Sequence, residues 1–119
     1  MPDRDDPALS QPIVELKAEL FKAMAHPTRI RVLEVLAEGE HSVGDMQALV
    51  GVESSNLSQQ LAVLRRAGLV TTRKEGSTVI YAMASALLID LLAAAKRVLI
   101  ASLSQNQDLL DDLRSAVDR

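Results

Sequence analysis

The fold is decided by residues 53–68, ESSNLSQQLAVLRRAG. Leu57, Leu61 and Leu64 recur at the i, i+4, i+7 spacing of a helix whose apolar face packs in a core. Ser54 is of a residue type favoured at helix N-caps, and Gly68 is of the type that ends helices in the left-handed conformation. The pattern therefore predicts one helix over residues 53–67.

The opposite face of this helix lacks the Glu and Lys typical of a solvated helix surface. It consists of Ser55, Gln59, Ala62 and Arg66, flanked by Asn56, Ser58 and Gln60. Amides and hydroxyls both donate and accept hydrogen bonds, which suits them to base edges and phosphates. The composition of this face predicts a DNA recognition helix.

The overall composition fits one small helical domain. A length of 119 residues supports a single core, and 48% hydrophobic with 2% aromatic residues indicates that aliphatic side chains fill it. The absence of cysteine excludes disulfides and thiolate metal sites. The net charge is −3, yet residues 54–81 carry four cationic side chains and one anionic one. A basic centre between acidic ends favours a protein that presents one face to DNA.

The preceding segments predict three further helices. We expect a flexible acidic tail over residues 1–12, and then an amphipathic helix that His26-Pro27 ends. Pro27 suits the first position of a second helix, and residues 42–45 resemble a capping box that opens a third helix, ended by Gly51. The apolar residues of the first two helices are Ile13, Leu16, Leu20, Phe21 and Met24, and then, facing inward, Ile30, Leu33 and Leu36.

After Gly68 the sequence changes period. The β-branched runs 69–73 and 78–82, separated by KEGS at 74–77, predict a β-hairpin over residues 69–83. A helix-turn-helix followed directly by such a hairpin is a winged helix, whose wing reaches the phosphate backbone or the minor groove. The predicted fold is therefore mainly α with a small β-hairpin: four helices, two strands and a long C-terminal helix.

The final helix is predicted to begin near Ser85, because neither glycine nor proline follows Gly76. Its apolar residues cover more than one face, which predicts pairing with a second copy. An alternative is a break near Ser104, where residues 104–107 also resemble a capping box. We assign residues 13–103 to the DNA-binding and dimerisation domain and 104–119 to a helical extension. The expected paired-helix seam contains Leu92, Leu99, Leu103, Leu110, Leu113 and Val117.

Several motifs together resemble the arsenical-resistance repressor (ArsR/SmtB) family of bacterial winged-helix regulators. They are FKAMAHPTRIRVL at 21–33, NLSQQL at 56–61, LRRAGLV at 64–70 and the wing pattern Gly-x-x-x-x-Tyr at 76–81. The resemblance covers about residues 16–99, and it implies a homodimeric repressor that an effector usually releases from DNA. It also implies an interface built from the first and last helices, for which we expect Leu16, Leu20, Leu88, Leu91, Leu92, Leu99 and Leu103.

The chain departs from the family where its metal sensors bind ions. Residues 42–44 read SVG in place of Cys-x-Cys, and Ser85 and Leu87 stand where other members place carboxylates and histidines. A histidine common late in the family's recognition motif is Gln60 here. His41 with Glu40 and Asp45 is the one loose group of ligand atoms, which is a poor basis for a transition-metal site. We predict no metal, no cofactor and, without a catalytic constellation, no enzyme activity.

Two segments supply the expected DNA contacts. Glutamine side chains can read adenine bidentately, whereas serine suits either phosphate or base. Arg65 lies nearer the buried face, where a structural ion pair is the alternative. The full set is Ser54, Ser55, Asn56, Ser58, Gln59, Gln60 and Arg66 in the helix, with Arg73, Lys74, Ser77 and Thr78 in the hairpin.

The leading interpretation is a cytoplasmic homodimeric repressor that binds an inverted-repeat operator in double-stranded DNA. The acidic, polar start of the chain does not resemble a signal peptide, and charges at Asp90, Lys96 and Arg97 argue against a membrane span. The alternatives are a winged-helix module that binds protein instead of DNA, and a metal-responsive repressor with a non-standard His/carboxylate site. A small apolar ligand, a partner protein and control by protein level all remain open as means of relieving repression.

Overall fold

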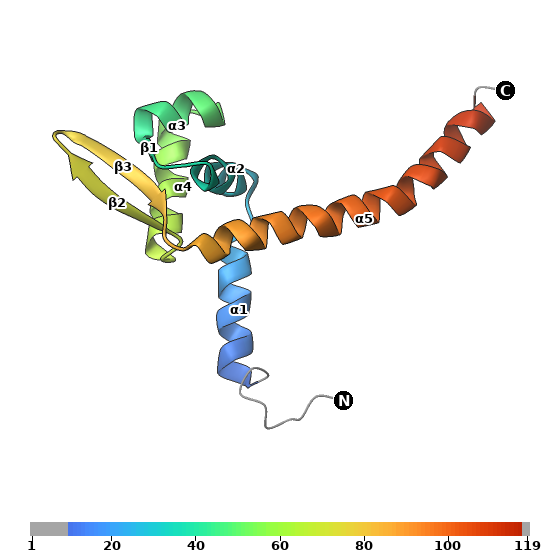
Figure 1. Ribbon diagram of the computed structural model, residues 1–119, viewed down its shortest axis with the longest axis horizontal. Coiled ribbons are helices and arrows are strands. Elements are labelled where there is room, and N and C mark those ends of the chain that lie inside the picture. The colour runs from blue at the N-terminus through green and yellow to red at the C-terminus, as the bar shows by residue number, and fades with distance from the viewer. Residues whose placement is uncertain (1–9, 118–119) are drawn as a thin grey trace. The chain divides into compact units, whose positions relative to one another are not determined.

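The computed structural model describes residues 10–117, which form two compact units that divide between Ala86 and Leu87. The second unit is the helix α5 (Ala86–Val117) from Leu87 onward. The first unit contains four helices and three strands, and Figure 1 shows their arrangement. They are α1 (Gln11–Met24), α2 (Pro27–Ala37), β1 (His41–Ser42), α3 (Val43–Val50), α4 (Ser54–Arg66), β2 (Val70–Glu75) and β3 (Thr78–Met83). The predicted winged-helix fold is confirmed.

Helix α2 lies at the centre of the first unit, because it contacts α3, α4 and β3. The predicted apolar stripe of α4 is confirmed, since Leu57, Leu61 and Leu64 are at most 1% exposed. The remaining core consists of aliphatic side chains and two methionines, in agreement with the aliphatic core that the composition predicted. It contains Met24, Val32, Leu33, Leu36, Met46, Leu69 and Val70.

One residue of the predicted core is misplaced. Ile30 is 37% exposed, whereas Val32 is fully buried. The buried stripe of α2 therefore runs through Val32, Leu33 and Leu36, and the i, i+3, i+6 series that began at Ile30 drifts out of it. The drift follows from 3.6 residues per turn, because six residues fall 120° short of two full turns.

The predicted helix ends are confirmed at several positions. Pro27 begins α2, and the Nδ1 atom of His26 accepts a hydrogen bond from the N–H of Thr28 at 3.1 Å. The Oγ atom of Ser42 accepts from the N–H of Asp45 at 3.2 Å and so caps α3, which Gly51 ends in the left-handed region. His26 is thus a residue of the junction between helices.

Gly68 ends α4 as predicted, in a left-handed conformation with φ of 76°. Its N–H donates to the carbonyl of Arg65, and the N–H of Leu69 donates to the carbonyl of Leu64, both at 3.0 Å. These two bonds form a Schellman motif. The motif turns the chain directly from the recognition helix into β2.

Two predicted helix starts are wrong by one or two residues. Helix α1 begins at Gln11, so residues 11 and 12 belong to the helix; the rest of the predicted tail lies outside the described residues apart from Ser10. Pro12 is tolerated in the first turn because that turn needs no amide donor from it. At α4 the N-cap is Glu53 instead of Ser54, since the carbonyl of Glu53 already accepts from the N–H of Leu57.

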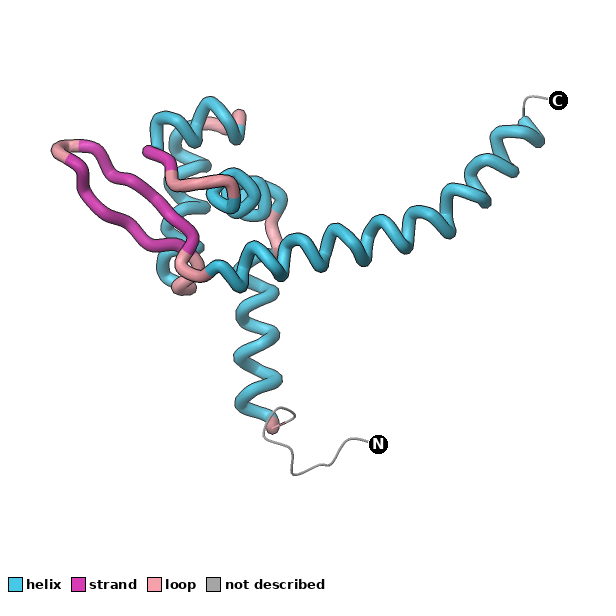
Figure 2. Tube along the Cα trace, viewed as in Figure 1, coloured by secondary structure: helices cyan, strands magenta, loops and turns pink. Residues whose placement is uncertain are grey.

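The sheet has one strand more than predicted. Strands β2 and β3 form the expected antiparallel hairpin, with Glu75 paired to Thr78 across a turn of two residues, Gly76 and Ser77. Figure 2 shows this hairpin in magenta. The two-residue strand β1 pairs antiparallel with β3, His41 opposite Tyr81, which gives the order β1-β3-β2. The additional strand fixes the base of the wing to the segment before α3.

Helix α5 continues through Ser104 without interruption, which confirms the continuous helix over the predicted break. Leu99, Leu103 and Leu110 on this helix are exposed. None of the helices within residues 10–117 combines the length and the apolar content of a membrane-spanning segment. The proposed domain limits at residues 13, 103 and 104 stay a prediction.

Candidate nucleic-acid interface

Helix α4 presents its polar face to solvent. Ser55, Ser58 and Gln59 are exposed, as are Ser54 and Arg66, while the leucine stripe on the other side holds the helix in the core. This arrangement is the one a recognition helix needs, because the buried face fixes the orientation of the side chains that meet a base pair.

Asn56 and Gln60 lie toward the edge of this face and are partly buried. The Nε2 atom of Gln60 donates to Oδ1 of Asn56 at 3.1 Å, one helical turn away. The bond uses one polar atom of each side chain. Gln59 is therefore the better placed glutamine for a bidentate contact to adenine.

The first turn of α4 has no side-chain cap, since Glu53 makes no capping hydrogen bond. Uncapped N–H groups at a helix start favour anions such as phosphate, although the Glu53 carboxylate adds negative charge nearby. The N-terminal end of α4 thus combines exposed hydroxyls, amide donors and one acidic side chain.

The tip of the hairpin supplies the second part of the predicted surface. Lys74, Ser77 and Thr78 are all exposed there, and Gly76 has φ of 65°, a conformation in which a residue with a Cβ would be strained. A lysine and two hydroxyl side chains flanking a tight turn suit contact with a phosphate backbone.

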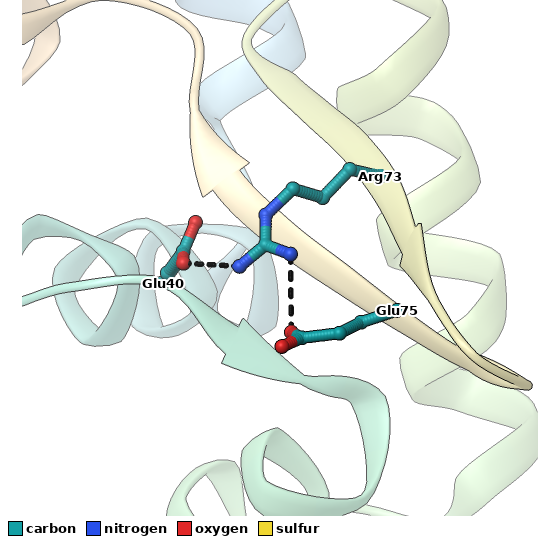
Figure 3. A network of polar contacts seen from close by, with 3 residues as sticks. All are labelled: Glu40, Arg73 and Glu75. Carbon is teal, nitrogen blue, oxygen red and sulfur yellow. Dashed lines mark hydrogen bonds and ion pairs between the residues drawn. The ribbon is translucent and has the colours of Figure 1, made fainter.

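Arg73 has a different environment from the one predicted. Figure 3 shows its guanidinium between two carboxylates, with Nη2 at 2.5 Å from Glu40 Oε1 and Nη1 at 3.0 Å from Glu75 Oε2. The hydrogen bond and positive charge of Arg73 lower the pKa of Glu40, and the hydrogen bonds that Arg73 donates to Glu40 and Glu75 raise the pKa of Arg73. Because two carboxylates offset its charge, Arg73 is a weaker candidate for phosphate contact than Lys74.

The Glu40–Arg73 pair joins residues 33 positions apart, so no local sequence pattern indicates it. It connects the start of β1 to the hairpin. The sequence alone suggested another role for Glu40, which was considered with His41 and Asp45 as a metal ligand.

We expect the substitution Arg73→Gln to raise the pKa of Glu40 to its ordinary value, measured by NMR titration of the Glu40 side chain. The matched change Lys74→Gln, one residue away, should leave that pKa low. Since the folded-state pKa lies below the unfolded one, the pair stabilises the fold above the unfolded pKa, and this contribution disappears as pH falls through the folded value. An unchanged Glu40 titration in Arg73→Gln would contradict the ion pair.

The residues considered for a metal site are not brought together. His41 is in β1 opposite Tyr81, Glu40 bonds Arg73, and Asp45 lies in the first turn of α3. Within residues 10–117, no group of three or more His, Cys, Asp or Glu side chains could hold a metal ion.

The predicted interface residues differ in exposure. Leu16, Leu99 and Leu103 are exposed, and Leu20, Leu91 and Leu92 are partly buried. Leu88 is 8% exposed. Their role in dimerisation stays a prediction.

This chain combines a helix-turn-helix, whose second helix has a buried apolar side and an exposed polar side, with a β-hairpin wing. These features define the class of winged helix-turn-helix DNA-binding proteins. Residues 24–73 match the helix-turn-helix domain family. Over 107 residues the chain is 52% identical to the uncharacterized HTH-type transcriptional regulator Rv0081 of Mycobacterium tuberculosis, covering 89% of this chain and 94% of the relative. The chain belongs to the ArsR-like family of winged helix-turn-helix transcriptional regulators.

Solved structures agree with this assignment. The crystal structure of M. tuberculosis Rv0081 superposes with a TM-score of 0.75 at 53% identity, covering 82% of this chain and 98% of the other. The crystal structure of the transcriptional repressor BigR from Xylella fastidiosa superposes with a TM-score of 0.71 at 33% identity, covering 82% of this chain and 96% of the other. The solution structure of the homodimeric winged helix-turn-helix domain of Mb0332 from Mycobacterium bovis superposes with a TM-score of 0.72 at 28% identity, covering 88% of this chain and 93% of the other.

Proposed function

We propose that this regulator is a cytoplasmic homodimeric repressor that binds an inverted-repeat operator, with α4 in the major groove and the β2–β3 hairpin as wing. The observation that carries the proposal is the exposed, amide- and hydroxyl-rich face of α4 opposite its buried leucines. That face can make sequence-specific bonds, while Arg66 and Lys74 can reach phosphates. BigR, a relative of this fold, is a repressor, which supports the direction of regulation.

The homodimer is supported by two features. Mb0332 is a homodimeric winged helix-turn-helix domain, and α5 of this chain exposes a row of large apolar side chains that includes Leu99, Leu103 and Leu110. Such an apolar surface favours association with another copy. A twofold dimer would present two α4 helices to successive major grooves about 34 Å apart, which matches an inverted repeat.

The test is a titration of the intact chain with DNA that the protein selects from a random pool. We expect the selected sequences to be inverted repeats and analytical ultracentrifugation to show two chains per duplex. A duplex with only one half-site should bind at least about tenfold more weakly, because one subunit loses its specific contacts. Selection of asymmetric sequences, or one chain per duplex, would contradict the proposal.

A protein-interaction module is the second candidate, since the outer face of α4 carries no charge over its first two turns. The exposed Lys74 at the wing tip favours DNA over this alternative. Failure of the same selection to enrich any sequence would favour the module.

A further inference from the structure

A groove in the first unit lies between α1, α2 and α4 and has a volume of about 580 Å³. This volume falls in the range of small-molecule sites. Helix α1 and the second half of α4 supply an apolar lining, and charged side chains from all three helices stand among it. The apolar residues are Leu16, Leu20, Ala23, Val63 and Ala67, and the charged ones are Glu19, Lys22, Arg29 and Arg66.

Arg29 is the unusual member of this lining. Its Nε atom is buried and has no hydrogen-bond partner among the described residues. A buried N–H donor without an acceptor is costly, and native proteins satisfy most such groups. Three cationic side chains and one carboxylate line the groove, so positive charge is in excess beside apolar surface.

We propose that this groove binds a small organic anion made of one carboxylate and an apolar tail. The carboxylate pairs with the Arg29 guanidinium, whose planar donors match its two oxygens. The tail lies against Ala23 of α1 and against Val63 and Ala67 of α4, and it leaves Leu16 and Leu20 to the expected dimer interface. An inorganic anion would leave the apolar lining uncovered, and a neutral apolar molecule would leave the excess positive charge of the groove unpaired.

Part of the groove lining belongs to α4, the proposed recognition helix. The expected effect of the ligand on DNA binding therefore rests on the proposed function. Val63, Arg66 and Ala67 line the groove, and Arg66 is also a proposed phosphate contact. A bound carboxylate competes with phosphate for the charge of Arg66. The ligand would therefore weaken DNA binding and relieve repression.

The site is tested by calorimetric titration of the intact chain at pH 7.5 with octanoate, and with octanamide as the uncharged control of equal length. We expect saturable octanoate binding at one site per chain, and at least about tenfold weaker binding of octanamide. Equal binding of the two probes would overturn the proposal, because the carboxylate would then contribute nothing.

Three variants give expectations of different sign. Arg29→Gln should weaken octanoate binding at least about tenfold, whereas Glu19→Gln should strengthen it about threefold by removing a like charge. Arg114→Gln, an exposed change on α5, should leave it unaltered. Circular dichroism checks whether Arg29→Gln still folds. If Arg29→Gln unfolds, Glu19→Gln still tests the site, because Glu19 is exposed and its replacement disturbs no packing.

Two further outcomes separate the possible failures. If the unsubstituted chain does not bind octanoate and the substitution Ala23→Trp disrupts dimers, the groove belongs to a second copy and the proposal is overturned. If octanoate binds as expected but does not lower DNA affinity, the regulatory coupling is overturned. Lack of specific DNA binding without octanoate would instead contradict the proposed function and leave the calorimetric result standing.

Discussion

Replacing Leu61 by alanine should lower the free energy of unfolding by about 2–5 kcal/mol, the range for truncating a fully buried leucine. Leu61 is 1% exposed and lies in the middle of the stripe that attaches α4 to the core. The loss combines reduced burial of apolar surface with the cavity that rigid neighbours leave unfilled. Urea unfolding at one fixed protein concentration measures it, because dimer stability depends on concentration.

The matched control is Ala62→Ser on the next residue, which is exposed. We expect this change to cost about 0.5 kcal/mol or less, since it alters helix propensity but no packing. Similar losses at positions 61 and 62 would mean that α4 does not bury the face described here, and the assignment of its outer face would fail with it.

The second large effect is expected at Gln59. Its removal by Gln59→Ala should weaken binding to the selected operator by roughly 5- to 150-fold per half-site, the value of a bidentate base contact, and should hardly change binding to random DNA. Gln59 is exposed on the outer face, whereas the neighbouring Gln60 already bonds Asn56. Mobility-shift titrations on both duplexes measure the difference.

Lys74→Gln provides the contrast at the wing tip. A lost phosphate contact should lower affinity on every sequence and reduce the slope of log K against log salt by about one for each subunit. If both variants lose affinity equally on operator and random DNA, the division into base and phosphate contacts is wrong.

Local patterns in the sequence were sufficient for most of the fold. The leucine spacing of α4, the glycine after it and the serine before α3 each act within a few residues, so each was readable without the structure. Boundaries were less secure: the difference between Glu53 and Ser54 as N-cap depends on backbone angles that no residue preference fixes. At α2, Ile30 and Val32 are both apolar, and only the packing of α2 against its neighbours selects Val32 for the core.

Features formed by distant residues were not readable. Strand β1 has two residues and exists because β3 lies beside it. The charge of Arg73 is offset by Glu40, which lies 33 residues earlier in the chain. The groove that contains Arg29 likewise requires α1, α2 and α4 to meet. Each of these depends on tertiary contacts, so a sequence interpretation assigned their residues to simpler roles.

If α4 docks in the major groove, bound DNA covers the outer face of this helix. The chain has no cysteine, so Ser55→Cys introduces one thiol on that face and Ser104→Cys introduces one on α5 as a control. We predict that saturating operator DNA slows thiol modification of Ser55→Cys at least about tenfold and leaves Ser104→Cys unchanged, because DNA covers only the first position. Equal modification rates of Ser55→Cys with and without bound DNA would contradict this docking of α4.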